Sequence, residues 1–396
     1  MNDMTKIEAQ TAKPAMISYD GINAIPLNTP IDQIDVQLFR EQSSYKPFHY
    51  QWAERFEDDQ QSVHWVPREV PMGEDLKNWA VQSEQLTDAE RALLMNIFRL
   101  FTQSDIDVAD NYMDTLTKVF KNGEVRRMLM VFGSFETVHI KAYSYVLESL
   151  KVPDSVYHEF LEIEEMREKH DWLKQYKSET LHDLLMTLAC FSSFVEGLQL
   201  FASFAMLMNF PRFGVMRGMG QIVTWSIRDE TIHVKAVQRL YHALLAECGI
   251  PSTALAPELQ AAARHFVDME DAFIDKAFEF GEVRGEKKEQ FKLFVRYVAD
   301  LRLQELDVDP IYNIEEHPIP WFDEQTGHEH ANFFETRATE YSKAQYKDTW
   351  EQAWDVLDRK HARDIDAEEV VDHPGLMMHQ KRIEAGLVED PELQLV

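Results

Sequence analysis

Residues 136–142 read ETVHIKA, and residues 230–236 read ETIHVKA. Five of the seven positions are identical, and the other two exchange valine and isoleucine. Each heptapeptide contains Glu-x-x-His, and two helical residues that are three positions apart point from one face. The next residue breaks the match, because Tyr143 follows the first copy and Val237 follows the second. The repeat therefore predicts two similar helical pairs of metal-ligand type, with a phenol beside only one.

Both copies lie in apolar surroundings, with Phe132 before the first and Trp225 before the second. Buried carboxylates and imidazoles must be paired or bound to a metal, because an isolated buried polar group is costly. A third Glu-x-x-His, at Glu179 and His182, falls in the first turn of another predicted helix. A glutamate there favours the helix N-terminus and stays solvated. We expect metal ligands in the first two copies only.

Residues 184–210 form a long apolar run with Glu196 and Gln199 near its centre. Exposure of such a charge to lipid would cost several kcal/mol. We therefore interpret the run as the central helix of a buried bundle, apolar on all faces because all are covered. Taken alone, Glu196 is most simply a buried acid bonded to a neighbouring helix. Beside two Glu-x-x-His pairs, it is expected to be a third carboxylate ligand.

A helix predicted at 88–120 offers a fourth carboxylate. Its segment TQSDIDVADNYMD contains four candidates, and their spacing leaves the choice open: Asp105, Asp107, Asp110 and Asp114. Two Glu-x-x-His pairs, with one carboxylate from each of two further helices, make the dimetal arrangement of ferritin-like bundles. We therefore predict an all-α, ferritin-like helical bundle with a dimetal-carboxylate site. Oxygen-rich ligation with two imidazoles suits iron or manganese.

Composition agrees with a helical protein and excludes several functions. Glycine (14) and proline (15) are scarce in 396 residues, which favours long helices over many tight turns. The net charge of −29 repels phosphate backbones and anionic lipid, so we expect no nucleic-acid and no membrane partner. Cys190 and Cys248 predict neither a disulfide framework nor a zinc site. The N-terminus shows no secretory signal, so a cytoplasmic location is expected.

The pattern divides the chain into an N-terminal arm (1–60), a helical body with the dimetal site (61–321) and a flexible acidic tail (322–396). A capping box at Thr87–Glu90 begins the first long helix, and Asn122-Gly123 is interpreted as its end. Further helices are predicted at 124–151, 155–171, from Ser178 to Pro211, and at 217–248, 257–282 and 286–306. The tail ends in the apolar sequence LQLV, either a frayed end or an anchor for a partner.

Tyr143 lies seven residues after Glu136, almost two helical turns, and therefore on the same face. Its distance from His139 along the axis is about 6 Å. An ordinary core tyrosine with one polar partner would explain it. A phenol beside an oxygen-activating dimetal site is also positioned to be oxidised.

Several motifs together carry a specific resemblance: HWVPREV, the Asp-containing helix, FETVHIKAY, FVEGLQLFASFA, RDETIHVKA, HPIPWF and NFFETRATEYSKA. Over roughly residues 60–345 the chain resembles the radical-bearing small (beta) subunit of class I ribonucleotide reductase. The resemblance implies a dimetal site that activates dioxygen, a stable tyrosyl radical on Tyr143, and transfer of that radical to a large subunit that reduces ribonucleotides to deoxyribonucleotides. The implied ligands are Asp107, Glu136, His139, Glu196, Glu230 and His233.

The resemblance also implies a radical-transfer route through Trp65, Asp229 and Tyr341. Taken singly, these would be a packing tryptophan, an acid paired with Arg228, and a tail residue. In the family, the acid at Asp229 hydrogen-bonds a histidine ligand, here His139, which orients the imidazole. Two iron ions are implied, with manganese or a mixed pair as alternatives. The implied partners are a second copy of the chain and the large subunit, bound through the C-terminal tail.

Two other functions share parts of this pattern. A soluble acyl desaturase or hydroxylase would have the same ligands but needs a substrate tunnel and no radical route. A ferritin-like iron store would be a shorter chain that forms closed cages. The set of Tyr143, Trp65 and Tyr341, together with the acidic tail, favours the reductase subunit.

Overall fold

The computed structural model describes residues 17–19, 22–159, 162–174 and 177–326, which belong to the compact unit Met1–His330. Tyr341, the terminal LQLV and the rest of the predicted tail from 327 onward lie outside the described residues. The division into arm, body and tail therefore stays a prediction.

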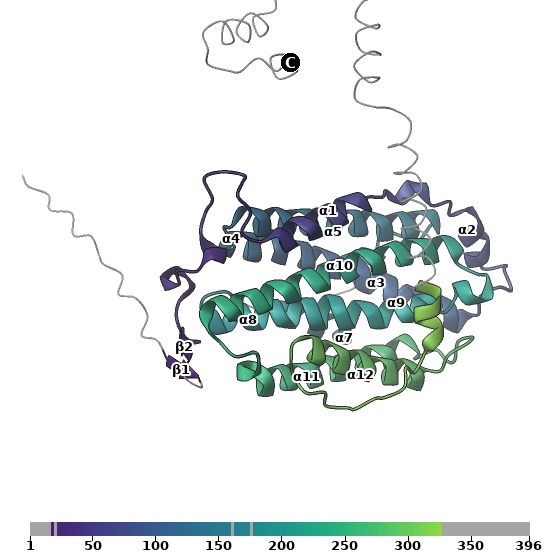
Figure 1. Cartoon of the computed structure of the whole chain (residues 1–396). Coiled ribbons are helices and arrows are strands. Elements are labelled where there is room, and N and C mark those ends of the chain that lie inside the picture. Colours follow the sequence, from purple (N-terminus) through teal and green to yellow (C-terminus); the bar gives the residue numbers. More distant parts are fainter. Residues whose placement is uncertain (1–16, 20–21, 160–161, 175–176, 327–396) are drawn as a thin grey trace, which may run out of the picture. The chain divides into compact units, whose positions relative to one another are not determined.

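Helices form nearly all of the regular structure, and the prediction of an all-α protein is confirmed (Figure 1). The α-helices are α1 (Gln51–Ser62), α2 (Gly73–Trp79), α3 (Asp88–Asp110), α4 (Thr117–Val119), α5 (Gly123–Ser149), α6 (Val156–Glu159), α7 (Glu164–Leu173), α8 (Leu181–Ala189), α9 (Phe201–Met208), α10 (Arg217–Cys248), α11 (Ala256–Ala277) and α12 (Lys288–Glu305). Two wider, π-helical segments are η4 (Asn111–Leu116) and η6 (Cys190–Leu200). Single 3₁₀ turns are η1 (Ile31–Gln33), η2 (Gln37–Phe39), η3 (Pro67–Glu69), η7 (Pro211–Phe213) and η8 (Ser252–Leu255). The strands β1 (Ile17–Tyr19) and β2 (Ile22–Ala24) pair antiparallel.

The segment α8–η6–α9 runs through the middle of the bundle. It packs against α10 and against α11 and α12 (Figure 1). Leu181–Phe213 is long and apolar enough to cross a membrane, but 94% of its most apolar window is buried inside the protein. This agrees with the prediction of a central core helix, since apolar residues on every face of a helix need cover on every face.

Local signals explain most helix ends. The predicted capping box at the start of α3 is present, because Thr87 and Glu90 exchange side-chain and backbone hydrogen bonds. Asn122 is not an end signal but caps the start of α5, where its side chain accepts from the Val125 amide. Thr180, rather than Ser178, caps α8. An asparagine can end one helix or begin the next, and serine and threonine are both common N-caps, so residue type alone did not decide which residue caps which helix.

The region before residue 61 contains more structure than an extended arm. α1 forms there and packs against α5 and α10. Backbone hydrogen bonds join residues 25–31 to the end of α10 and the start of α8, through Ile25 to Cys248, Leu181 to Thr29 and His182 to Leu27. These contacts could not be predicted from the polar, proline-containing sequence, because its hydrogen bonds are made with distant parts of the chain.

Candidate metal centre

Four helical segments bring acidic and imidazole side chains together in the core. α5 contributes Glu136 and His139, α10 contributes Glu230 and His233, η6 contributes Glu196, and α3 contributes Asp105. All six side chains are buried, with at most 1% of each residue exposed. One ligand atom each from Glu136, Glu196, Glu230 and His233 lies within 4.8 Å of the others. We call these six residues the carboxylate cluster.

The histidine of each heptapeptide contacts the glutamate of the other. Nδ1 of His139 lies 3.0 Å from Oε1 of Glu230, and Nδ1 of His233 lies 3.0 Å from Oε1 of Glu136. Each histidine therefore faces the glutamate of the other repeat. Five of the six ligands expected from the sequence meet in this cluster.

The cluster contains buried polar atoms without hydrogen bonds in the described part of the chain. They are Oδ2 of Asp105, Oε2 of Glu196 and Nε2 of His233, whereas Oε1 of Glu136 and Oε2 of Glu230 contact Nδ1 of His233 at 3.0 and 3.4 Å. Buried polar groups in proteins are almost always hydrogen-bonded, so such a concentration needs an explanation. Metal ions accept lone pairs from these atoms, and a set of carboxylates with two imidazoles fits iron or manganese.

The pKa values of the cluster carboxylates also indicate a metal site. Burial, together with the charge of Glu136, raises the pKa of Asp105 well above its usual range. Burial also raises the pKa of Glu196 to about 7. Burial alone would also raise the pKa of Glu136. The neighbouring His139 and His233 outweigh this effect and lower the pKa of Glu136 to about 2. Four carboxylates in a dry site repel one another, and two divalent cations would balance their four negative charges.

The structure corrects the assignment of Asp107. Its Oδ2 lies 2.5 Å from Nδ1 of His170 on α7. Asp105, two residues earlier, interacts electrostatically with Glu136 and His139 instead. Two residues turn an α-helix by roughly 200°, so the two side chains leave opposite faces of α3. Asp110 and Asp114 are exposed. Asp105 is therefore the aspartate that the fold brings to the cluster.

Glu196 is carried by the π-helical segment η6. The backbone carbonyl of Gly197 accepts a hydrogen bond from Nε of Arg302 on α12, 2.9 Å away. A Cβ at Gly197 would lie 2.6 Å from that Nε and 2.9 Å from the carbonyl oxygen of Ser192. Only glycine fits here without displacing either group. π-Helical turns occur often at functional sites, and this one sets the position of Glu196.

Tyr143 is buried on the same helix as Glu136 and His139. Its hydroxyl donates to Oγ of Ser226, 3.3 Å away. Its ring stacks on Phe101, with centroids 4.4 Å apart, and Phe101 in turn stacks on Phe204 at 5.3 Å. Burial and the nearby Asp105 carboxylate raise the pKa of Tyr143 above its usual range. The phenol therefore keeps its proton in an apolar, aromatic environment.

Trp65 and Asp229 contact the cluster at His139. Oδ2 of Asp229 accepts from Nε1 of Trp65 at 2.7 Å and lies 3.2 Å from Nε2 of His139. Its Oδ1 accepts from Arg228. Burial alone would raise the pKa of Asp229, but the hydrogen bond with His139 and the charge of Arg228 lower it. Asp229 is thus an ionised acid that orients a histidine of the cluster, as carboxylates behind metal-binding histidines commonly do.

Sequence reasoning missed several contacts of this site. Phe101 and Ser226 touch Tyr143, Trp225 lies 5.1 Å from Trp65 between ring centroids, and Tyr112 reaches Glu196. The third Glu-x-x-His behaves as expected, since Nε2 of His182 lies 2.6 Å from Glu258 on α11 and Glu179 is exposed.

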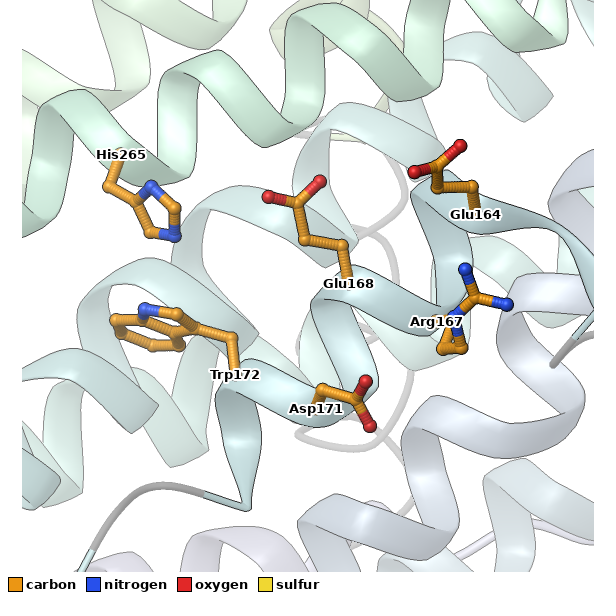
Figure 2. A pocket seen from close by; sticks show the side chains of 6 residues that line it. All are labelled: Glu164, Arg167, Glu168, Asp171, Trp172 and His265. Carbon is orange, nitrogen blue, oxygen red and sulfur yellow. The ribbon is translucent and has the colours of Figure 1, made fainter.

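A second group of acidic side chains lines a surface pocket between α7 and α11. The pocket has a volume of about 690 Å³; in it Glu168 points between Trp172 and Glu164, and His265 faces Trp172 from α11 (Figure 2). Arg167 and Asp171 complete the lining. None of these residues belongs to the carboxylate cluster, and acids on an open surface are normally solvated.

A helical bundle that places two Glu-x-x-His pairs and two further carboxylates in its core has the architecture of the ferritin-like dimetal-carboxylate proteins. Residues 42–318 match the family model described as "Ribonucleotide reductase, small chain". The chain belongs to this family, the small subunits of an oxidoreductase that works with a large subunit. The resemblance found in the sequence motifs is thereby confirmed.

Named relatives agree with this assignment. The chain is 37% identical over 335 residues to a probable ribonucleoside-diphosphate reductase small subunit of Invertebrate iridescent virus 3, covering 80% of this chain and 88% of that protein. The ribonucleotide reductase R2 subunit from Clostridium botulinum superposes with a TM-score of 0.65 at 22% identity, covering 72% of this chain and 91% of that one. The Rnr4 homodimer from Saccharomyces cerevisiae gives 0.60 at 16% identity, with 77% and 92% covered. The ferritin-like fold is confirmed, and the desaturase, hydroxylase and iron-store alternatives are not favoured.

Proposed function

We propose that this chain is the radical-generating subunit of a ribonucleoside-diphosphate reductase. In this proposal the carboxylate cluster holds two metal ions, and Tyr143 is the residue oxidised to a stable radical. The ligands are Asp105, Glu136, His139, Glu196, Glu230 and His233. The observation that carries the proposal is the buried, aromatic setting of Tyr143 on the helix that supplies two of these ligands.

Two bound ferrous ions would supply electrons that reduce dioxygen, and this dioxygen chemistry would provide the oxidant that takes an electron from Tyr143; manganese accepts the same ligands. The protein's own contribution is to position and protect. Phe101 covers the face of the Tyr143 ring, and Oγ of Ser226 accepts a hydrogen bond from the Tyr143 hydroxyl. With 1% of Tyr143 exposed, water and external reductants have no direct contact with the ring. A radical in this place would therefore be long-lived.

Trp65, Asp229 and His139 form the first part of a route by which the radical leaves. The two hydrogen-bonding contacts of Asp229 support this proposal, because they join the tryptophan to the cluster through one carboxylate oxygen. Tyr341 would continue the route, and the C-terminal tail would bind the large subunit; both lie outside the described residues. By analogy with the Rnr4 homodimer, we expect two copies to associate.

The strong negative charge of the chain, −29, supports the expectation that it binds neither nucleic acid nor membrane, and a cytoplasmic location fits this.

Low-temperature EPR tests the proposal directly. The metal-free protein is loaded with ferrous iron and exposed to oxygen, beside Tyr143→Phe and the matched control Tyr241→Phe. Tyr241 is a buried tyrosine on α10 whose hydroxyl has no hydrogen bond within the described residues. We expect a narrow organic radical signal in the wild type and the control, and none in Tyr143→Phe. A coupled diferric pair without a radical in any sample would contradict the iron–tyrosyl assignment.

A further inference from the structure

A second buried tyrosine touches the carboxylate cluster from another side. The hydroxyl of Tyr112 donates a 2.6 Å hydrogen bond to Oε1 of Glu196. Only 1% of Tyr112 is exposed. We propose that Tyr112 is a positioning residue that occupies Oε1 of Glu196 and leaves Oε2 as the oxygen that binds a metal ion. This inference rests on the proposed dimetal function.

The backbone places Tyr112 on the cluster face of its helix. It follows Asp105 by seven residues, almost two turns, and lies in η4, where α3 widens into a π-helical segment. Its ring meets Phe132 edge to face, with centroids 5.9 Å apart, and it meets His233 in the same way at 5.9 Å. These contacts restrict the direction of the hydroxyl, since a buried ring packed against two neighbouring rings cannot turn freely.

The state of Glu196 supports this role. Its Oε2 is buried and makes no hydrogen bond among the described residues. A carboxylate with two equivalent free oxygens can bind a metal through either one or both. A hydrogen bond from a neutral phenol to one oxygen favours metal binding through the other, because turning the carboxylate inside the core would break that bond and leave a buried donor unpaired. Groups of this kind behind a ligand tune metal affinity substantially.

Tyr112 and Tyr143 differ in what their hydroxyls contact. Tyr143 donates to the side chain of Ser226 and stacks on Phe101, whereas Tyr112 donates to a carboxylate of the cluster. The first is therefore held near the cluster without a hydrogen bond to a ligand, and the second is tied to one. The structure assigns them separate tasks: oxidation for Tyr143 and orientation of Glu196 for Tyr112.

Co²⁺ titration followed by visible absorption tests the inference on wild type, Tyr112→Phe and Tyr241→Phe. We expect two Co²⁺ equivalents in all three proteins. In Tyr112→Phe one of them should bind roughly 10–100-fold more weakly and show an altered spectrum, because Glu196 has lost its fixed orientation. The other equivalent and Tyr241→Phe should match wild type. Wild-type affinities and spectra in Tyr112→Phe would overturn the inference and leave the proposed function intact. Failure of the wild type to bind two equivalents would overturn both.

A structure of the wild-type protein loaded with Mn²⁺ decides the same point without a variant. Glu196 bound through one oxygen, with the other on the Tyr112 hydroxyl, is the expected result. Glu196 bound through both oxygens, or Tyr112 turned away, would contradict it.

Discussion

Trp65 and Asp229, 164 positions apart in the sequence, are joined by a 2.7 Å hydrogen bond from the indole nitrogen to Oδ2. The same oxygen lies 3.2 Å from His139. One carboxylate oxygen therefore connects the segment before η3 with a histidine of the carboxylate cluster. A change at Asp229 removes contacts with both Trp65 and His139, whereas a change at Trp65 leaves the contact between Asp229 and His139 in place.

This difference separates metal binding from radical transfer. Asp229→Asn should lower metal affinity by roughly 10–100-fold, because His139 loses the charge that orients it. Trp65→Phe should keep metal binding and the Tyr143 radical, yet lose most ribonucleotide reduction when the large subunit is added. Metal titration, EPR and turnover, measured on the same preparations, check this. Trp79→Phe, a partly buried tryptophan on α2, is the control. Full turnover in Trp65→Phe would exclude this route.

The choice of aspartate on α3 is open to a matched test. Asp105→Asn should lower the amount of bound metal or the affinity for it. Asparagine has nearly the same shape as aspartate, but it lacks the negative charge of the oxygen ligand. Asp107→Asn should leave metal binding unchanged, since that side chain contacts His170. Equilibrium binding of Mn²⁺ measures both variants. The reverse pattern, with metal lost only in Asp107→Asn, would restore the assignment first made from the family motif.

Gly197→Ala should disturb η6. The new Cβ would lie 2.9 Å from the Ser192 carbonyl oxygen, a backbone group that cannot move without altering the turn that carries Glu196. Overpacking of this kind costs roughly 1–3 kcal/mol of unfolding free energy, and metal affinity should fall with it. Gly73→Ala is the control, because a Cβ there meets nothing within 4 Å. Denaturant unfolding of both metal-free variants provides the comparison, and equal stability would argue against the close packing.

Glu90 provides a pH-dependent contribution to stability. It is 2% exposed and accepts hydrogen bonds from Arg284 as well as from the Thr87 amide. Burial alone would raise its pKa, but these partners lower it. Because the folded-state pKa lies below the unfolded value of about 4.3, the contribution is present above that pH and is lost as the pH falls through the folded pKa.

Glu90→Gln should therefore destabilise the metal-free protein by roughly 1–3 kcal/mol near pH 7. The difference from wild type should shrink below about pH 4. Chemical unfolding at both pH values measures it. Glu279→Gln, which removes one partner of the surface pair with Lys276, should change stability by less than about 1 kcal/mol at either pH. A difference for Glu90→Gln that does not depend on pH would mean that its charge is not involved.

The fold was largely predictable because its helices carry strong local signals. The period of apolar residues and the Thr87 capping box located α3, and Gly249 ended α10 where expected. Asn122 was misinterpreted because an asparagine between two helices can end one or begin the next. α1 was missed because its sequence is polar, and its helix is stabilised by packing on α5 and α10 rather than by its own pattern.

The site was predictable wherever a motif fixed the spacing. The two Glu-x-x-His pairs and Glu196 met as expected, whereas the aspartate did not. A signal did exist: Phe101, Asp105, Val108 and Tyr112 follow one another at intervals of four, three and four, and all are buried. Had this stripe been used to set the rotation of α3, Asp105 would have faced the core and Asp107 would not. Tyr112 would have been found by the same step.

The reciprocal contacts of the two heptapeptides limit how the sequence of this protein can change during evolution. Each histidine faces the glutamate of the other repeat, so neither copy forms a complete site of its own. A substitution in one copy weakens contacts made by both, and the effects of two such substitutions should not add independently. The sequences of the two copies are therefore expected to change together during evolution or to stay unchanged. Tyr143 and Val237, which follow them, take no part in these reciprocal contacts.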